Sequence, residues 1–188
     1  MRVVGGVFGG MAIKTPKTGA LRPTQDRVRE ALFNIVRGGI EGRAFLDLFA
    51  GTGAVGIEAL SRGASSVTFV ERDGRHLAAL SENLAELARR GCPAERWRTV
   101  RADAGRFLAS CVGGAFGAAF ADPPYAEAGA EWCAATLRAA AGAVAPGGFF
   151  IAETSASTVP PAAEGWELYR DRTYGKTRLS VWRRLAQT

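Results

Sequence analysis

The residues best suited to chemistry are Asp122-Pro123-Pro124-Tyr125, which follow a short apolar run that ends at Ala121. Each residue before a proline is pushed towards extended geometry, and neither proline has an N–H, so backbone carbonyls stay available as acceptors. The Asp122 carboxylate and the Pro123 carbonyl could each accept one hydrogen of an exocyclic amine, which would aim the nitrogen lone pair at an electrophilic methyl group. Tyr125 could stack on a base drawn out of its helix. The motif therefore predicts methylation of an amine, although D-P-P is also an ordinary turn.

A second candidate site is the stretch FLDLFAGTGAVG at residues 45–56, where Gly51, Gly53 and Gly56 have the G-x-G-x-x-G spacing after an apolar strand. In this pattern the first glycine permits a sharp turn and the second permits close approach of a ligand. The third lets the next helix pack on the sheet, with its N-terminal N–H groups facing the ligand. The spacing does not name the ligand, because dinucleotide enzymes share it.

Asp47 lies inside that strand, four residues before Gly51. A carboxylate there gains nothing from a pyrophosphate but attracts an ammonium or a sulfonium, and S-adenosylmethionine carries both cations and no phosphate. The carboxylate of this cofactor could lie at the helix N-terminus. We therefore predict S-adenosylmethionine, with a nicotinamide or flavin cofactor as the alternative. Asp47 could also hold the loop together by hydrogen bonds, and the two roles can coexist.

Two more carboxylates follow expected strands. Glu71 closes the apolar run 66–70 and lies 20 residues beyond Gly51, where an acid that binds a ribose diol is expected. Asp103 follows the expected strand 97–102, where it could accept a hydrogen bond from an adenine amino group or cap the next helix. Because the carboxyl ends of parallel strands share one edge of a sheet, these acids and Asp47 would line one ligand-binding edge.

The elements that position these groups alternate along the chain. A helix after Thr24, its possible N-cap, has apolar residues at i, i+3 and i+4 and is expected to end at Gly38-Gly39. Residues 1–20 could be a short edge hairpin or a loose arm. We further expect helices at 55–61, from the cap Asp73 to Gly91, and at 128–144, with strands at 118–121, 149–153, 166–172 and 177–183.

Composition sets the class of protein. The chain of 188 residues has 47% apolar residues, which suits one domain: an N-terminal arm or hairpin at 1–21 and a catalytic core at 22–188. It has no membrane-length apolar run and no signal-peptide pattern, so we expect a cytoplasmic protein without a membrane partner. Three scattered cysteines and a single histidine, His76, predict neither a metal site nor a disulfide scaffold nor a histidine base.

The net charge of +6 is unevenly spread: +5 over residues 1–43, −3 over 44–165 and +4 over 166–188. Basic ends around an acidic centre predict that the ends meet a polyanion while the centre holds a cationic cofactor, although basic surface also serves solubility. Candidate contacts cluster near the start of the first helix and in the expected C-terminal hairpin: Arg22, Arg27, Arg29, Arg170, Arg172, Lys176 and Arg178.

With these residues in hand, the chain resembles the RsmD-type methyltransferases, which methylate the exocyclic N2 of a guanine in small-subunit (16S) ribosomal RNA. The resemblance runs nearly end to end through the motifs LRPTQDRVREALFNIV, DLFAGTGAVGIEALSRGA, VERD, ADA, DPPY and YGKTRLSVWRR. It implies an α/β fold, a three-layer Rossmann-like class I methyltransferase with a seven-stranded, mostly parallel sheet and an antiparallel C-terminal strand. The target it implies is guanine 966.

The resemblance also implies roles for named residues. The cofactor-binding set is Asp47, Phe49, Gly51, Thr52, Gly53, Glu71, Arg72, Asp103 and Ala104. The catalytic set is Asp122 to Tyr125. The RNA-binding set is predicted from the basic clusters at the two ends of the chain and not from the resemblance: Arg22, Thr24, Arg27, Arg29, Lys176 and Arg178. One departure matters: the family's arm carries several lysines and arginines, whereas residues 6–12 here have none. Either the RNA contacts have moved to Arg22, Arg27, Arg29 and the C-terminal hairpin, or RNA affinity is weaker.

The expected partner is 16S ribosomal RNA within the 30S subunit or its assembly intermediate. A chain this short leaves little room for a separate target-reading domain, so selectivity should come from the shape of the presented RNA. We expect a monomer without a metal ion. The alternatives are a DNA adenine-N6 methyltransferase, which would share every cofactor residue, and a non-catalytic RNA-binding assembly factor.

Overall fold

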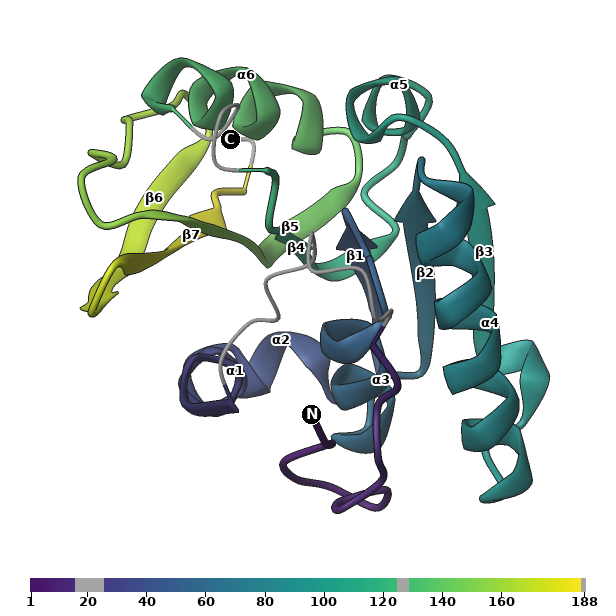
Figure 1. The fold of residues 1–188 in the computed structure, drawn as a ribbon. Coiled ribbons are helices and arrows are strands. Elements are labelled where there is room, and N and C mark those ends of the chain that lie inside the picture. Colours follow the sequence, from purple (N-terminus) through teal and green to yellow (C-terminus); the bar gives the residue numbers. More distant parts are fainter. Residues whose placement is uncertain (16–25, 125–128, 187–188) are drawn as a thin grey trace.

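Seven strands form one mixed sheet in the order β3-β2-β1-β4-β5-β7-β6 in the computed structural model, which describes residues 1–15, 26–124 and 129–186 (Figure 1). The strands are β1 (Ala44–Leu48), β2 (Ser66–Glu71), β3 (Trp97–Arg101), β4 (Phe116–Ala121), β5 (Val144–Ser155), β6 (Trp166–Tyr174) and β7 (Thr177–Arg184). The helices are α1 (Asp26–Ile35), α2 (Arg37–Ile40), α3 (Ala54–Ser61), α4 (Gly74–Arg89), α5 (Ala104–Ala109) and α6 (Ala130–Ala140), with a 3₁₀ turn at Ala94–Arg96.

Strands β1 to β5 are parallel where they pair, whereas β7 runs antiparallel to both β5 and β6. The central strands β1, β2 and β4 are almost wholly buried, as their continuous apolar runs predict for a sheet covered on both faces. The predicted α/β fold with a seven-stranded, mostly parallel sheet is therefore confirmed.

Helices cover both faces of the sheet (Figure 1). The first four helices and the N-terminal residues share one apolar cluster with one face, which includes Leu32, Ile57 and Leu84. Helices α5 and α6 cover the other face, where Leu108 and Leu137 belong to one buried apolar cluster with Phe150 and Trp182. This packing fixes the loops that leave the carboxyl ends of the strands.

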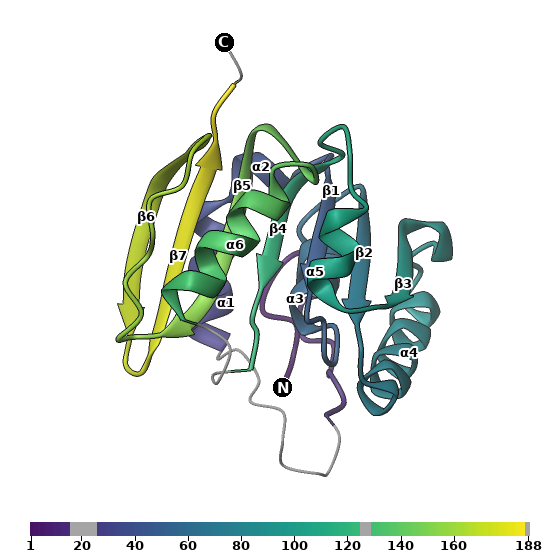
Figure 2. The same ribbon diagram turned by 90° about the horizontal axis from the view of Figure 1, so that it is seen from above.

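The β6–β7 turn lies at the same edge of the sheet as the carboxyl ends of β2 and β4 (Figure 2). The register explains this, because Ser155, the last residue of β5, pairs with Thr177, the first residue of β7. Tyr174, Gly175 and Lys176 therefore lie at the edge where the loops of a parallel sheet bind ligands.

The first helix ends earlier than the sequence predicts. Helix α1 ends at Ile35, and Gly38-Gly39 lies inside a second short helix, α2, so the prediction that these glycines end the helix is wrong. At Gly39 a Cβ would lie 2.5 Å from Cδ2 of Phe149, so glycine allows close packing of α2 on the sheet. The residues before Asp26, with the proposed cap Thr24, lie outside the described part of the chain.

Two other boundaries differ. Helix α6 ends at Ala140, because Val144 already pairs with Phe116 in the sheet, so the predicted extension of this helix to residue 144 is wrong. Strand β5 is longer than the predicted 149–153, since it pairs with β4 on one side and β7 on the other. Strand β6 continues to Tyr174 for a similar reason: its far end pairs with Thr177.

The first fifteen residues form a small antiparallel hairpin, which we call the N-terminal arm (residues 1–15). Arg2 bridges Ala12, and the Val3 N–H donates to the Met11 carbonyl at 2.9 Å. Val3, Met11 and Ile13 are buried against the core. The hairpin packs on α3 and does not extend an edge of the main sheet, so the predicted edge position is wrong for the residues that the structure describes.

Within the described ranges, no helix has the length and apolar character needed to cross a membrane. The same residues contain no group of three or more His, Cys, Asp or Glu side chains placed to hold a metal ion. Cys92 and Cys133 are buried, Cys111 is half-buried, and burial raises the pKa of Cys133 to about 11. Buried free cysteines of this kind behave as small apolar residues.

Candidate active site

The candidate site lies where the order of the strands reverses. From β1 the chain adds β2 and β3 on one side, and β4 and β5 on the other. Leu48 pairs with Ala121, so the loop that begins at Phe49 and the motif that begins at Asp122 leave neighbouring strands side by side. Open α/β sheets bind ligands at such a switch point. Both stretches with predicted chemistry are thus brought together.

The glycine loop needs the glycines at their spacing. Gly51 and Gly53 have φ values of +55° and +80°, a region that side chains other than glycine rarely adopt. At Gly56 a Cβ would lie 2.2 Å from Cε1 of Phe69, so glycine permits α3 to pack on the sheet, as predicted. Phe49 also has a positive φ, +61°, which marks local strain beside the loop.

Asp47 is 1% exposed, and its Oδ2 accepts a hydrogen bond from the Gly56 N–H at 2.8 Å. The predicted role of holding the loop together is therefore present. Burial raises the pKa of Asp47 to about 7, the Gly56 N–H opposes this rise, and the charge of Glu71 adds to it. A buried carboxyl group with a pKa near 7 loses its proton and becomes negatively charged readily when a cation approaches.

Glu71 is also buried, and its carboxylate joins two loops. Oε2 accepts the Gly51 N–H at 2.9 Å and Oε1 accepts the Asp73 N–H at 2.8 Å. Nδ1 of His76 lies 3.6 Å from Oε2. The predicted spacing of 20 residues thus brings Glu71 to the glycine loop, and binding of a ribose there stays a prediction. The neighbouring Arg72 is exposed.

Asp103 is the N-cap of α5, since its Oδ1 accepts the Arg106 N–H at 3.1 Å. Of the two predicted roles, capping is present in the structure. The side chain is exposed, whereas the next residue, Ala104, is buried. Thr52, another residue of the predicted cofactor set, is buried within the glycine loop.

The structure describes the D-P-P segment, residues 122–124, at the carboxyl end of β4. Asp122 is half-buried, Pro123 is buried and Pro124 is exposed, directly after the buried strand β4. Beside them, the ring of Phe49 lies 5.9 Å from that of Trp132 on α6. Tyr125, the predicted stacking residue, lies outside the described residues.

The basic residues separate into accessible and engaged groups. Lys176 is exposed in the β6–β7 turn and Arg27 is exposed on α1. Arg178 is half-buried, with a hydrogen bond to the Thr158 carbonyl at 2.5 Å. These groups can meet a polyanion only to the extent that they are accessible. Arg22 and Thr24 belong to the part of the chain that the structure does not describe.

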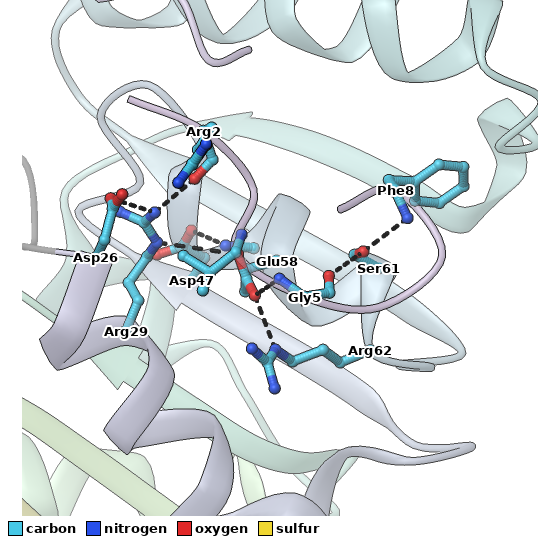
Figure 3. Close-up of polar contacts among 11 residues, drawn as sticks. Arg2, Gly5, Phe8, Asp26, Arg29, Asp47, Glu58, Ser61 and Arg62 are labelled. Atoms are coloured by element: carbon cyan, nitrogen blue, oxygen red, sulfur yellow. Dashed lines mark hydrogen bonds and ion pairs between the residues drawn. The ribbon is translucent and has the colours of Figure 1, made fainter. Parts of the chain in front are cut away.

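Arg29 does not fit the predicted RNA-binding role. Its side chain is 0% exposed, and Nη2 donates to the Arg2 carbonyl at 2.6 Å and to Asp26 at 2.9 Å (Figure 3). Its Nε lies 4.0 Å from Glu58. The guanidinium instead ties α1 to the N-terminal arm, because a buried cation needs acceptors within the protein.

Glu58 fixes the other end of this network. Its buried carboxylate accepts the N–H groups of Val4 at 2.6 Å and Gly5 at 2.8 Å, and it pairs with Arg62 at 2.7 Å (Figure 3). Ser61 accepts the Phe8 N–H at 2.9 Å. The N-terminal arm is therefore bound directly to α3, the helix that begins at the glycine loop.

Three residues near the site were not in the predicted set: His76, Trp132 and Asn83. Asn83 is 1% exposed and donates to the Thr52 carbonyl at 2.9 Å. The sequence carried a signal for it, since a polar residue stands among leucines on the apolar face of α4. No comparable pattern marked His76 or Trp132, whose contacts come from other segments of the chain.

Comparison with known proteins agrees with this geometry. Ribosomal RNA small subunit methyltransferase D of Escherichia coli K12 is 33% identical over 187 residues, covering 100% of this chain and 91% of that protein. The solved structure of yhhF from Escherichia coli is 31% identical with a TM-score of 0.84, covering 100% and 99% of the two chains. SMU.776, solved with SAH, is 15% identical with a TM-score of 0.67, over 87% of this chain and 50% of that one, and shows the fold alone.

The sheet order, the glycine loop and the D-P-P segment at the switch point define a class I methyltransferase. The family described as "Conserved hypothetical protein 95" matches residues 1–183. The chain belongs to this family, the RsmD family.

Proposed function

We propose that this protein transfers the methyl group of S-adenosylmethionine to the exocyclic N2 of a guanine in small-subunit ribosomal RNA. The observation that carries the proposal is the pairing of Leu48 with Ala121, which sets the cofactor loop beside Asp122 and Pro123. The relatives named ribosomal RNA small subunit methyltransferase D support the choice of substrate class.

The residues of the site fit the cofactor. Asp47 is a buried acid whose pKa of about 7 lets it become charged beside a cation. Gly51 and Gly53 turn the backbone without a side chain in the cradle, and Glu71 lies at the loop where a ribose diol is expected. When bound, S-adenosylmethionine supplies an electrophilic methyl group on a sulfonium.

The chain's own groups then position the amine. The Asp122 carboxylate and the Pro123 carbonyl each accept a hydrogen bond from one N–H of the amine. These two bonds turn the nitrogen lone pair out of conjugation with the ring and towards the methyl group. As the N–C bond formed and the S–C bond of the donor broke, S-adenosylhomocysteine would leave, and Asp122 would stabilise the positive charge that develops on nitrogen. The methylated amine would then release one proton to water. Tyr125 holds the base by stacking on its face. Catalysis rests on orientation and electrostatics, without a strong base.

The substrate is the small subunit or an assembly intermediate, with guanine 966 as the nucleotide to be mapped. Exposed Lys176 and Arg27 contact phosphates of the RNA, while the shape of the folded RNA presents the base. We propose that the protein acts as a monomer in the cytoplasm. Equal methylation rates on naked RNA and on assembled subunits would argue against recognition by shape.

The test offers small subunits, free ribosomal RNA and double-stranded DNA side by side with S-adenosylmethionine, followed by nucleoside mass spectrometry. We expect N2-methylguanosine from the RNA. N6-methyladenine in DNA would instead identify the adenine methyltransferase. No methylated product, together with an assembly function retained in Asp122→Ala, would identify a non-catalytic assembly factor.

A further inference from the structure

Asn83 on α4 joins the cofactor loop to the N-terminal arm. Its Nδ2 donates to the Thr52 carbonyl at 2.9 Å and to the Lys14 carbonyl at 3.0 Å. Its Oδ1 accepts the Lys14 N–H at 2.9 Å. The side chain is 1% exposed, so one buried amide satisfies backbone groups of two segments that are distant in the sequence.

We propose that Asn83 is a positioning residue for cofactor binding. It holds the loop at Thr52 against the arm at Lys14, so that docking of the N-terminal arm and binding of the cofactor stabilise each other. The inference takes from the proposed function only the identity of the ligand. Asn83 acts through the loop, and it needs no contact with the cofactor itself.

The loop depends on such outside support. Phe49, Gly51 and Gly53 all have positive φ values, so the backbone between β1 and α3 is held in a conformation that local sequence alone does not strongly favour. Thr52 lies inside this stretch and is 7% exposed. Without Asn83, its buried carbonyl would lose a donor, which would favour other loop conformations and weaken ligand binding.

The N-terminal arm has a second, independent attachment. Glu58 accepts the N–H groups of Val4 and Gly5, and Ser61 contacts Phe8. The arm should therefore remain docked on α3 when Asn83 is replaced, which allows the coupling to be removed without removing the arm.

The chain also offers a matched control. Glu82, the neighbour of Asn83, pairs with Nζ of Lys14 at 3.0 Å, but both side chains are more than half exposed. Glu82→Ala thus removes a contact between α4 and the same arm residue without touching Thr52. An exposed ion pair of this kind contributes little to stability.

The experiment measures S-adenosylmethionine affinity by calorimetry in the wild type, Asn83→Ala and Glu82→Ala. We expect affinity to fall about tenfold in Asn83→Ala, the size expected when a buried carbonyl loses its donor, and to stay unchanged in Glu82→Ala. A fall in melting temperature of Asn83→Ala with unchanged affinity would overturn the proposal, because a merely structural residue would behave in that way.

Hydrogen exchange tests the coupling first in the wild type alone, by comparing the protein with and without cofactor. The amides of Val3, Gly10 and Ile13 close the arm hairpin. In the wild type, saturating S-adenosylmethionine should slow the exchange of these amides. Because coupling is reciprocal, the factor of slowing should be about equal to the factor by which arm docking raises cofactor affinity. The slowing should vanish in Asn83→Ala and persist in Glu82→Ala. Unchanged exchange in the wild type would overturn the proposal even if Asn83→Ala failed to fold.

Neither readout involves RNA or methyl transfer. A chain that couples cofactor to arm and methylates no RNA would refute the proposed function and leave this inference standing. A chain that methylates RNA but whose arm exchange does not change on cofactor binding would refute this inference and leave the proposed function standing.

Discussion

Glu71 accepts the amide N–H of Gly51 at 2.9 Å and thereby joins the loop after β2 to the loop after β1. The residue that spacing predicts as a ribose ligand is thus also a structural acceptor. The two roles are compatible, because each carboxylate oxygen has two lone pairs and can accept a second hydrogen bond.

The observed acceptor role of Glu71 and its proposed contact with ribose predict two separable effects. Glu71→Ala leaves the N–H groups of Gly51 and Asp73 without this acceptor, so the free energy of unfolding should fall by about 1–3 kcal/mol. Glu71→Gln keeps one acceptor oxygen and should lose less stability. Both variants should bind S-adenosylmethionine more weakly. Urea unfolding and calorimetry measure the two effects, and unchanged affinity in Glu71→Ala would contradict the predicted contact with ribose.

The raised pKa of Asp47 predicts a pH dependence of cofactor affinity. A cation favours the charged carboxylate, so S-adenosylmethionine should bind more tightly as the pH rises through about 7, and binding below that pH should release a proton. Asp47→Asn keeps an oxygen that can accept the Gly56 N–H but carries no charge. The variant should bind more weakly above pH 7 and lose the dependence. Identical pH profiles would leave Asp47 only its loop-holding role.

The same shift affects the cofactor-free protein in the opposite direction. Because the folded-state pKa of Asp47 is raised from 3.8 to about 7, the folded protein holds this proton more tightly than the unfolded chain. The contribution of this group to stability is therefore greatest below pH 3.8 and is lost as the pH rises to about 7. Comparing urea unfolding of the wild type and Asp47→Asn across this range isolates the contribution, which should be absent in the variant.

Accessible and buried basic residues should respond differently to truncation. Arg27→Ala and Lys176→Ala remove exposed charges, so RNA affinity should fall, and the slope of log affinity against log salt should decrease by about one for each phosphate that the variant no longer neutralises. Arg29→Ala should instead lower the free energy of unfolding by about 3 kcal/mol, since Asp26 and the buried Glu58 lose a partner. If Arg29→Ala had wild-type stability and bound RNA more weakly, the predicted RNA-binding role of Arg29 would be supported after all.

Short-range patterns predicted the individual strands and the acids at their ends, whereas the seven-stranded sheet was predicted from the resemblance to the RsmD-type methyltransferases. The apolar runs around Asp47 and before Glu71 and Asp122 mark buried strands, and parallel strands place their carboxyl ends together. The glycine spacing likewise follows from local backbone geometry and from one close contact between Gly56 and Phe69.

The remaining features depend on contacts between distant segments. Nothing near Arg29 shows that the N-terminal arm will cover it, and the pattern around Glu58 does not reveal that its partners include Val4 and Gly5. The extra length of β5 follows from pairing with β7, a strand that comes later in the chain. Such partners are set by the tertiary fold, which local sequence patterns do not encode.

Tyr125 follows the D-P-P segment, so its ring should carry a stacking role. Tyr125→Phe should retain most activity, whereas Tyr125→Ala should lose about 1–3 kcal/mol of interaction with the base. Steady-state methylation assays with RNA as the varied substrate measure this loss. Equal damage from the two variants would show that the hydroxyl, and not the ring face, is required.

The most direct test of the account measures methyl transfer and cofactor affinity in Asp122→Ala. If Asp122 acts only on the amine, the rate of transfer should fall by at least about a hundredfold, as for the loss of a preorganised electrostatic contact. Calorimetry should meanwhile show unchanged affinity for S-adenosylmethionine. Methyl transfer at the wild-type rate, or loss of cofactor binding in place of transfer, would contradict the assignment of Asp122 to the amine.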